Sequence, residues 1–355
     1  MNLEKPILAA LLSVKSDKLS DAEKKLFEKF NPLGVVLLKR NIISAEQTKN
    51  LICSIKETIG RDDVIIALDE EGGRLTHLFY ENNSLASQNI LGQVNDVEIT
   101  QIHAKLVARQ MQKIGANMVL APVLDIDYPQ TTIALKNRCF GNDKEKVLVH
   151  GKTMCETYIN SGICPCIKHI PGHGRAVNDP HAKLPKICSD MKDLEADFYP
   201  FKHLNHMPSA MTAHILLTKI DNKKPISISK IGIQEIIRKN IGFNGMLFSD
   251  AIDMHALKGD VIKKAQNVWQ SGCDVVTYCL ADEQEMINLC NNGIYLQDKA
   301  LERFEKIKNI ICSKKETIIL DNQIKKYYSG LSSFTENNIK YDAMEVLHQK
   351  QKGEK

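Results

Sequence analysis

Short apolar runs alternate with segments of helical periodicity between residues 7 and 293, and this alternation limits the possible folds more than any other feature. The eight runs expected to be strands are residues 7–12, 35–38, 64–68, 118–121, 163–167, 210–213, 246–248 and 274–277. The eight segments expected to be helices are residues 21–30, 44–59, 98–114, 143–161, 190–205, 228–239, 260–271 and 282–293. Ser20 and Ser44 are expected to cap the first two helices. The pattern predicts an α/β fold, a single (β/α)8 TIM-like barrel, with an open doubly wound sheet as the alternative.

The last part of the chain differs from the rest, because it is polar and ends in a charged tail. We expect a barrel over residues 1–296 and a C-terminal helical extension over residues 297–355, which wraps the barrel or frays at its end. No apolar run reaches about 18 residues, the length that crosses a bilayer, and residues 6–14 lack the cleavage site of a signal peptide. We therefore predict a cytoplasmic monomer that does not associate with membranes.

Charge argues against nucleic acid as a partner. The 47 basic and 43 acidic residues give a net charge of only +4, and the lysines are scattered along the chain. Eight arginines stand against 39 lysines, so an arginine in a loop is expected to make the two-point contacts that lysine cannot. Arg40, Arg74, Arg138 and Arg175 lie in or beside such loops.

The ten cysteines do not indicate disulfides or a metal site. No CxxC motif occurs, and in a chain of this length without a secretion signal we expect buried, reduced thiols. Cys164 and Cys166 lie two residues apart in an apolar run, which predicts that they share one face of a strand and pack in the core.

A barrel places its catalytic groups at the C-terminal ends of its strands. Acids and imidazoles stand at five of the predicted strand ends, which favours an active site there over ordinary polar loop starts. These residues are Asp69, Asp125, His169, His214 and Asp250.

The segment 168–181, KHIPGHGRAVNDPH, is the densest in reactive side chains. Its three histidines could bind zinc, but Pro171 and the neighbouring glycines argue against the helix that would align them. It is not a dinucleotide fingerprint, because Val177 stands where the third glycine would be. Asp179 lies two residues before His181, close enough to orient the imidazole for proton transfer, unless the two form only a surface ion pair.

Two further segments carry acids at strand ends. In LDEEGGRL, residues 68–75, Asp69 could bind sugar hydroxyls, whereas three carboxylates would repel a phosphate; an acidic helix start is the alternative. In GMLFSDAIDM, residues 245–254, Asp250 ends a hydrophobic strand, where a fixed, partly desolvated carboxylate suits a nucleophile that attacks an anomeric carbon. Asp253 is the competing carboxylate.

Together these segments resemble the bacterial β-N-acetylhexosaminidases of glycoside hydrolase family 3, the NagZ type. The matching motifs follow the family's order over about residues 30–280. They are LDEEGGRL, NMVLAPVLDI, NRCFGND, IKHIPGHG with DPH eleven residues after its Lys, MTAH, GFNGMLFSDAIDM and SGCDVV. The resemblance implies a single TIM-like barrel without the second domain of the family's β-glucosidases.

The resemblance also implies an activity. It is retaining hydrolysis of terminal β-linked N-acetylglucosamine from 1,6-anhydro-muropeptides during peptidoglycan recycling, with no metal or organic cofactor. Asp250 would form the covalent glycosyl-enzyme, and His181, assisted by Asp179, would be the acid/base. The residues that would hold the hydroxyls and the N-acetyl group are Asp69, Arg138, Lys168 and His169.

Four positions depart from the family pattern. His77 stands where the family usually places an arginine, so this substrate-binding position is expected to make a weaker or different sugar contact. Lys136 replaces a usual glycine, and Ala251 replaces a common aspartate. Pro180 replaces a common serine and is expected to stiffen the loop that carries the acid/base pair.

Three alternatives remain open at this point. One is a non-hydrolytic muropeptide-binding sensor, motivated by the changes at residues 77 and 136. The others are a β-glucosidase of the same family and a phosphorylase that uses the same covalent intermediate. The β-glucosidases generally take their acid/base from another region, and a phosphorylase would depend on phosphate.

Overall fold

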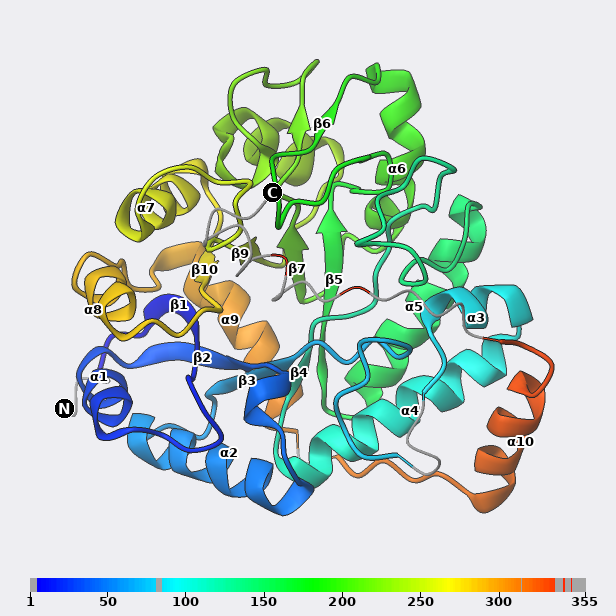
Figure 1. Ribbon diagram of the computed structural model, residues 1–355, viewed down its shortest axis with the longest axis horizontal. Helices are drawn as coiled ribbons and strands as arrows, with labels where there is room; N and C mark the ends of the chain where they lie inside the picture. Colours follow the sequence, from blue (N-terminus) through cyan, green and yellow to red (C-terminus); the bar gives the residue numbers. More distant parts are fainter. Residues whose placement is uncertain (1–4, 81–84, 314, 336–340, 342–345, 347–355) are drawn as a thin grey trace.

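The computed structural model describes residues 5–80, 85–313, 315–335, 341 and 346. Its centre is a closed barrel of parallel strands with helices around the outside (Figure 1). The barrel strands are β1 Leu8–Ser13, β2 Pro32–Leu37, β3 Ile65–Leu68, β4 Met118–Val119, β5 Cys164–Ile170, β7 Ser209–Thr212, β9 Met246–Ala251 and β10 Val275–Thr277. Each pairs with the barrel strand before it, and β10 pairs with β1. The predicted barrel is confirmed, and the alternative of an open sheet is wrong.

The outer helices match the predicted helical segments. They are α1 Asp21–Phe30, α2 Ala45–Ile59, α4 Val97–Ile114, α5 Lys144–Asn160, α6 Met191–His203, the π-helix η4 Gly232–Asn240, α7 Val261–Ser271 and α8 Glu283–Asn291. Both predicted caps are confirmed. The Ser20 hydroxyl accepts the backbone N–H of Glu23, whose carboxylate accepts the Ser20 N–H, and Ser44 accepts the N–H of Gln47.

Several short elements escape the periodicity of the sequence, because each is only one or two turns or a single residue pair long. They are α3 Gln88–Val94, η1 Lys39–Asn41, η3 Ile226–Ile228, and the strands β6 Lys186–Ile187 and β8 Leu216–Leu217. The last two pair in parallel outside the barrel. They join the loop that follows β5 to the loop that follows β7, and so fix the far end of the segment that carries Asp179 and His181.

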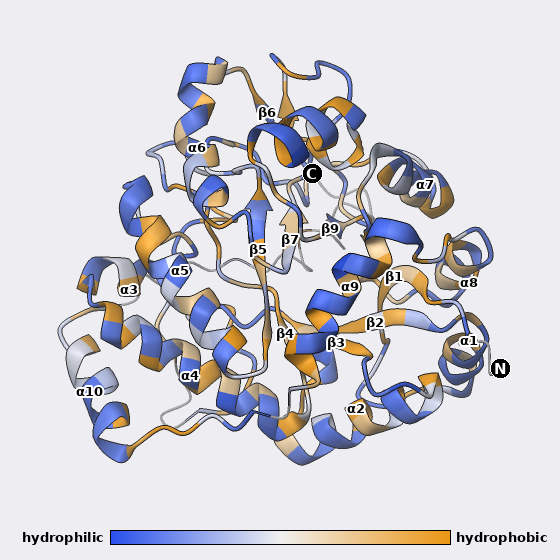
Figure 2. Ribbon diagram, turned by 180° about the vertical axis from the view of Figure 1, so that it is seen from behind, coloured by the Kyte–Doolittle hydropathy of each residue, from blue (hydrophilic) through white to orange (hydrophobic). Residues whose placement is uncertain are grey.

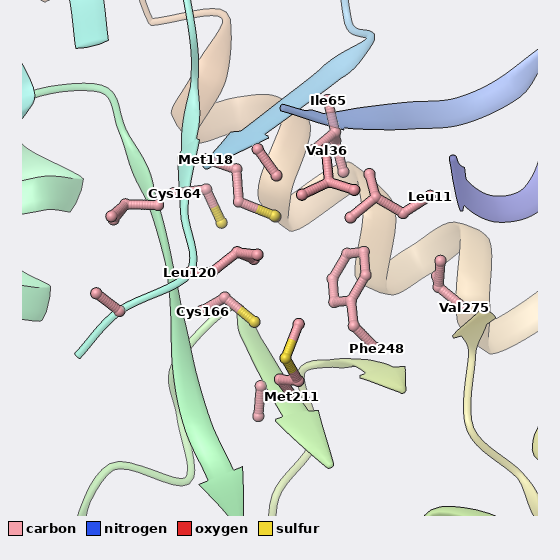
Figure 3. Close-up of a cluster of buried hydrophobic side chains, with 14 of the residues drawn as sticks. Leu11, Val36, Ile65, Met118, Leu120, Cys164, Cys166, Met211, Phe248 and Val275 are labelled. Atoms are coloured by element: carbon pink, nitrogen blue, oxygen red, sulfur yellow. The ribbon is translucent and has the colours of Figure 1, made fainter. Parts of the chain in front are cut away.

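Apolar side chains fill the inside of the barrel (Figure 3). Cys164 and Cys166 both lie in this core and are fully buried, as predicted, and burial raises the pKa of both thiols. All ten cysteines are free thiols. The expectation that the cysteines are buried is wrong for Cys53, Cys188 and Cys312, which are exposed.

Two helices follow the barrel. α9 Asp298–Ile311 lies across the end of the barrel at which the strands begin (Figure 2), where Arg303 binds Asp274, the residue before β10. α10 Asp321–Leu331 packs against α4 on the outside. The extension therefore wraps the barrel, whereas its charged tail lies outside the described residues, and the division at residue 296 stays a prediction. Within the described part of the chain, no helix is both long and apolar enough to cross a membrane.

Candidate active site

A cavity of about 600 Å³ lies at the end of the barrel where the strands finish. Its wall is formed by side chains from β2, β5, β7, β9 and β10, by side chains from the loops after β2, β3, β4, β5, β9 and β10, and by Tyr341. The predicted site residues that line it are Asp69, His77, Arg138, Lys168, His169, His181 and Asp250. The eighth, Asp179, contacts His181 directly. The fold thus gathers residues that are far apart in the sequence, and their individual roles stay predictions.

Two of the five strand-end residues support the site from behind. Asp125 is fully buried, and its Oδ2 lies 2.7 Å from Nδ1 of His169, while its Oδ1 accepts the backbone N–H of His173 at 2.6 Å. His214 is also buried, and its Nε2 lies 3.1 Å from the carbonyl oxygen of Ala251. Asp125 therefore orients a cavity residue, and His214 braces the end of β9.

Asp250 lies near the end of β9, almost fully buried at the cavity wall. Burial by itself raises the pKa of this carboxyl, but the nearby imidazoles of His214, His169 and His181 and the Ala251 N–H, which donates at 2.8 Å, bring the pKa below its usual value. Asp250 is therefore an ionised carboxylate at neutral pH, the state that a nucleophile requires.

Asp253, the competing carboxylate, lines the same cavity in a different electrostatic setting. Its Oδ1 accepts the backbone N–H of Cys279 at 2.8 Å, and burial raises the pKa of the carboxyl. Burial thus favours the neutral form of Asp253, whereas the surroundings of Asp250 favour the charged form that a nucleophile requires.

Asp179 and His181 form a close pair. The imidazole Nδ1 lies 2.8 Å from Asp179 Oδ1, and the same oxygen accepts the His181 backbone N–H at 2.9 Å. Burial alone would raise the pKa of Asp179, but the hydrogen bond to His181 and its charge lower it below the usual value. When Nδ1 donates to this carboxylate, Nε2 is the nitrogen left to exchange a proton.

The loop that carries this pair is tied to the loop after β9. The carbonyl oxygen of Pro180 accepts the backbone N–H of Ala256 at 3.0 Å. This bond joins the segment that carries the acid/base pair to the segment that follows Asp250.

A buried network of two cations and two carboxylates forms another wall. Lys168 Nζ lies 2.5 Å from Asp69 Oδ1 and 2.6 Å from Glu71 Oε1. Arg138 donates to both oxygens of Glu71, from Nε and Nη2, at 2.8 Å each. This two-point contact is the kind expected of a loop arginine. The Asp69 side chain is 29% exposed, so it can meet a ligand, whereas Glu71 is fully enclosed.

The two glutamates after Asp69 have opposite surroundings. Burial works to raise the pKa of Glu71, but Arg138 and Lys168 outweigh it and lower the pKa well below its usual range. Glu70 has no such cation, and burial raises its pKa to about 8, although it accepts bonds from the His77 and Leu78 N–H groups and Tyr80. Neither glutamate caps a helix as the alternative for this segment required.

The departures at residues 77 and 136 differ in their relation to the cavity. The His77 side chain lines it, whereas Lys136 points to Asp127, with Nζ 2.6 Å from Oδ1, and does not line the cavity. The change at residue 136 therefore leaves the cavity wall intact.

Sequence reasoning missed three residues of the site. In the sequence Glu71 is one of three consecutive acidic residues, and only the fold shows that it binds both Arg138 and Lys168. Asp125 stood at a strand end but gave no sign that it holds His169. Tyr341 lines the cavity from the C-terminal extension, and no motif surrounds it in the sequence.

Of the three histidines weighed as zinc ligands, two have a carboxylate partner and the third, His173, is buried. His169 faces Asp125, His181 faces Asp179, and burial lowers the pKa of His173 to about 4. In the parts of the chain that the structure describes, no group of three His, Cys, Asp or Glu side chains is arranged to hold a metal ion.

Comparison with known proteins gives a consistent result. Residues 5–310 match the family model of the glycosyl hydrolase family 3 N-terminal domain. A β-hexosaminidase of Neisseria gonorrhoeae is 30% identical over 277 residues, 75% of each chain, and one of Chromobacterium violaceum is 30% identical over 285 residues, 77% of this chain and 79% of the relative. The crystal structure of NagZ from N. gonorrhoeae with N-trifluoroacetyl-D-glucosamine has a TM-score of 0.79 at 25% identity, covering 92% of this chain and 97% of that one.

Proposed function

Because the chain belongs to glycosyl hydrolase family 3, we propose that it is a retaining exo-β-N-acetylglucosaminidase that acts on peptidoglycan-derived 1,6-anhydro-muropeptides. Membership makes the protein a glycoside hydrolase. The names of the relatives and the sugar analogue bound by N. gonorrhoeae NagZ support an N-acetylated hexose as the sugar that is released. The proposal includes a cytoplasmic monomer.

One observation carries the proposed mechanism. An ionised carboxylate, Asp250, and a carboxylate-held imidazole, His181, belong to the same cavity. Retaining hydrolysis needs one group that attacks the anomeric carbon and another that protonates the leaving oxygen. Asp250 and His181 are the candidates for these two groups.

In the first step Asp250 attacks the anomeric carbon while the bond to the leaving group breaks. His181 gives its Nε2 proton to the departing oxygen, and Asp179 stabilises the imidazolium before the transfer. The products of this step are the freed aglycone and a glycosyl ester on Asp250.

In the second step the neutral His181 takes a proton from water, and the resulting nucleophile attacks the same carbon. The ester bond to Asp250 breaks, and the sugar leaves with a free hydroxyl. Two inversions at one carbon give net retention, and both side chains return to their starting protonation states.

The network of Asp69, Lys168 and Arg138 is proposed to hold the terminal sugar. Asp69 keeps part of its carboxylate open to the cavity, and the two cations supply donors already fixed by Glu71. His169, oriented by Asp125, and His77 complete this proposed wall. A rigid set of donors and acceptors loses little freedom when a sugar binds.

Hydrolysis assays test the proposal. We expect the purified protein to cleave 4-nitrophenyl β-N-acetylglucosaminide between about pH 5 and 8 and to leave the β-glucoside nearly intact, because the family resemblance predicts N-acetyl recognition. NMR of the first product should show the β-anomer. A muropeptide with the 1,6-anhydro end should then release free N-acetylglucosamine.

Other outcomes would redirect the assignment. Cleavage of the β-glucoside at a similar rate would favour a β-glucosidase, and turnover that requires phosphate would favour a phosphorylase. Binding of the disaccharide in calorimetry without any product would favour the sensor, for which Lys136 gives no support because it lies outside the cavity wall.

A further inference from the structure

Tyr341 reaches the acid/base pair from the C-terminal extension, 160 residues after His181 in the chain. Its hydroxyl donates to Asp179 Oδ2 at 2.6 Å, and the same hydroxyl lies 3.2 Å from His181 Nδ1. The Asp179 carboxylate is thus bound on both sides, by His181 at Oδ1 and by Tyr341 at Oδ2. A carboxylate with a donor on each oxygen cannot rotate without losing a bond.

The ring of Tyr341 is also held in place. The guanidinium of Arg74 lies over it, 4.8 Å from the ring centroid, and Arg74 itself donates to the carbonyl oxygens of Ile133 and Ala134. Burial, together with the bond to Asp179, raises the pKa of Tyr341, so the hydroxyl keeps its proton and acts as a donor. These contacts give the hydroxyl one position.

We propose that Tyr341 is a positioning residue for the acid/base pair, which orients Asp179 and sets the proton affinity of His181. This inference rests on the proposed function of that pair. A hydroxyl that donates to the carboxylate disperses its negative charge, so the carboxylate stabilises the imidazolium less strongly. Tyr341 therefore makes His181 a stronger acid toward the leaving oxygen.

Other charged groups face the pair and remain unchanged when Tyr341 is altered. Asp250, Asp253 and His214 lie close enough to His181 to interact with its charge. Arg138 and Arg74 face Tyr341. Removal of the hydroxyl alone therefore isolates its effect on Asp179 and His181.

Tyr341→Phe removes the hydroxyl and keeps the ring over Arg74. We expect kcat/KM for a β-N-acetylglucosaminide with a poor leaving group to fall about tenfold, and that for the 4-nitrophenyl glycoside to fall far less, because acid catalysis matters most for poor leaving groups. The basic limb of the pH profile should move up by about half a unit. Tyr199→Phe is the matched control, since Tyr199 donates to Glu145 on the exposed surface, and its profile should equal that of the wild type.

A measurement without substrate separates this inference from the proposed function. The ¹⁵N resonance of the His181 ring, assigned by its loss in His181→Gln, should titrate about half a unit higher in Tyr341→Phe than in the wild type. An unchanged titration overturns the inference, as does an equal loss of kcat/KM on both leaving groups. If the wild type hydrolyses neither glycoside, the proposed function fails, and the titration still decides the role of Tyr341.

Discussion

The two ends of the barrel both contain buried carboxylates, but they use them differently. At the end where the strands begin, Asp274 accepts Arg303 at Oδ1, and Arg238 and the Leu247 N–H at Oδ2, at distances of 2.6 to 2.8 Å. At the other end, Asp250 accepts only the Ala251 N–H among the bonds found in the described residues, and it lines the cavity.

The two carboxylates differ in whether cations of the protein itself neutralise their charge. Asp274 is surrounded by cations from η4 and α9, so it joins elements and has no capacity for a ligand. Asp250 keeps its charge through neighbouring imidazoles and one N–H, which leaves an oxygen able to react. Burial of an acid is therefore not by itself a sign of catalysis. The informative feature is a buried carboxylate that no lysine or arginine of the protein neutralises.

The largest effect should come from Asp250. Asp250→Asn keeps the shape and the acceptor for the Ala251 N–H but removes the nucleophile, so we expect turnover to fall by at least about 10⁴-fold. Asp253→Asn is the matched control and should stay within about tenfold of the wild type. Assays of 4-nitrophenyl β-N-acetylglucosaminide, with thermal melting of each variant, decide between the carboxylates. Loss confined to Asp253→Asn would reverse the assignment.

The loss of activity on substitution of His181 should depend on the leaving group of the substrate. His181→Gln removes the proton donor, and we expect kcat/KM to fall about 10³-fold on a substrate with a poor leaving group, such as the natural disaccharide, and much less on the 4-nitrophenyl glycoside. A ratio of the two losses close to one would assign the acid/base role to another residue.

At the end of the barrel where the strands begin, a substitution should change stability rather than activity. Asp274→Asn leaves Arg238 and Arg303 without their carboxylate, so we expect the free energy of unfolding to fall by roughly 3 kcal/mol, with kcat/KM per folded molecule nearly unchanged. Urea denaturation measures the loss. Glu235→Gln, which breaks an exposed pair with Lys239, is the control and should change stability by less than about 0.5 kcal/mol. A fall in kcat/KM of Asp274→Asn would show that the two ends are coupled.

Much of the fold was predictable, because each strand and helix of the barrel carries its own hydrophobic period. The short pair β6 and β8 was not, since two residues per strand leave no period to detect. The polar segment after residue 296 gave no sign that Arg303 would bind Asp274 and hold α9 across the barrel. Such contacts depend on the packing of complete elements.

The candidate site was predictable where short motifs carry it. Asp69, His169 and Asp250 were predicted at strand ends, so the barrel itself brings them to one cavity. Glu71 and Tyr341 could not be assigned in the same way. The role of Glu71 becomes visible only from the two cations that it binds, and no local sequence pattern predicts that Tyr341 contacts Asp179.

The smallest predicted effect is that of Glu70. It tests a comparison within the end of the barrel that holds the cavity, between Glu70 and Glu71. Burial raises the pKa of Glu70 from 4.5 to about 8, so between these values the folded protein keeps a proton that the unfolded chain has released. The unfolded state then binds fewer protons, and stability falls as pH rises from about 5 to 8. Gln has no such proton to lose, so Glu70→Gln should gain about 1 kcal/mol relative to the wild type at pH 8 compared with pH 7. Urea denaturation at the two pH values measures this difference. Parallel stability curves would mean that the His77, Leu78 and Tyr80 donors already hold Glu70 as an anion, as Arg138 and Lys168 hold Glu71.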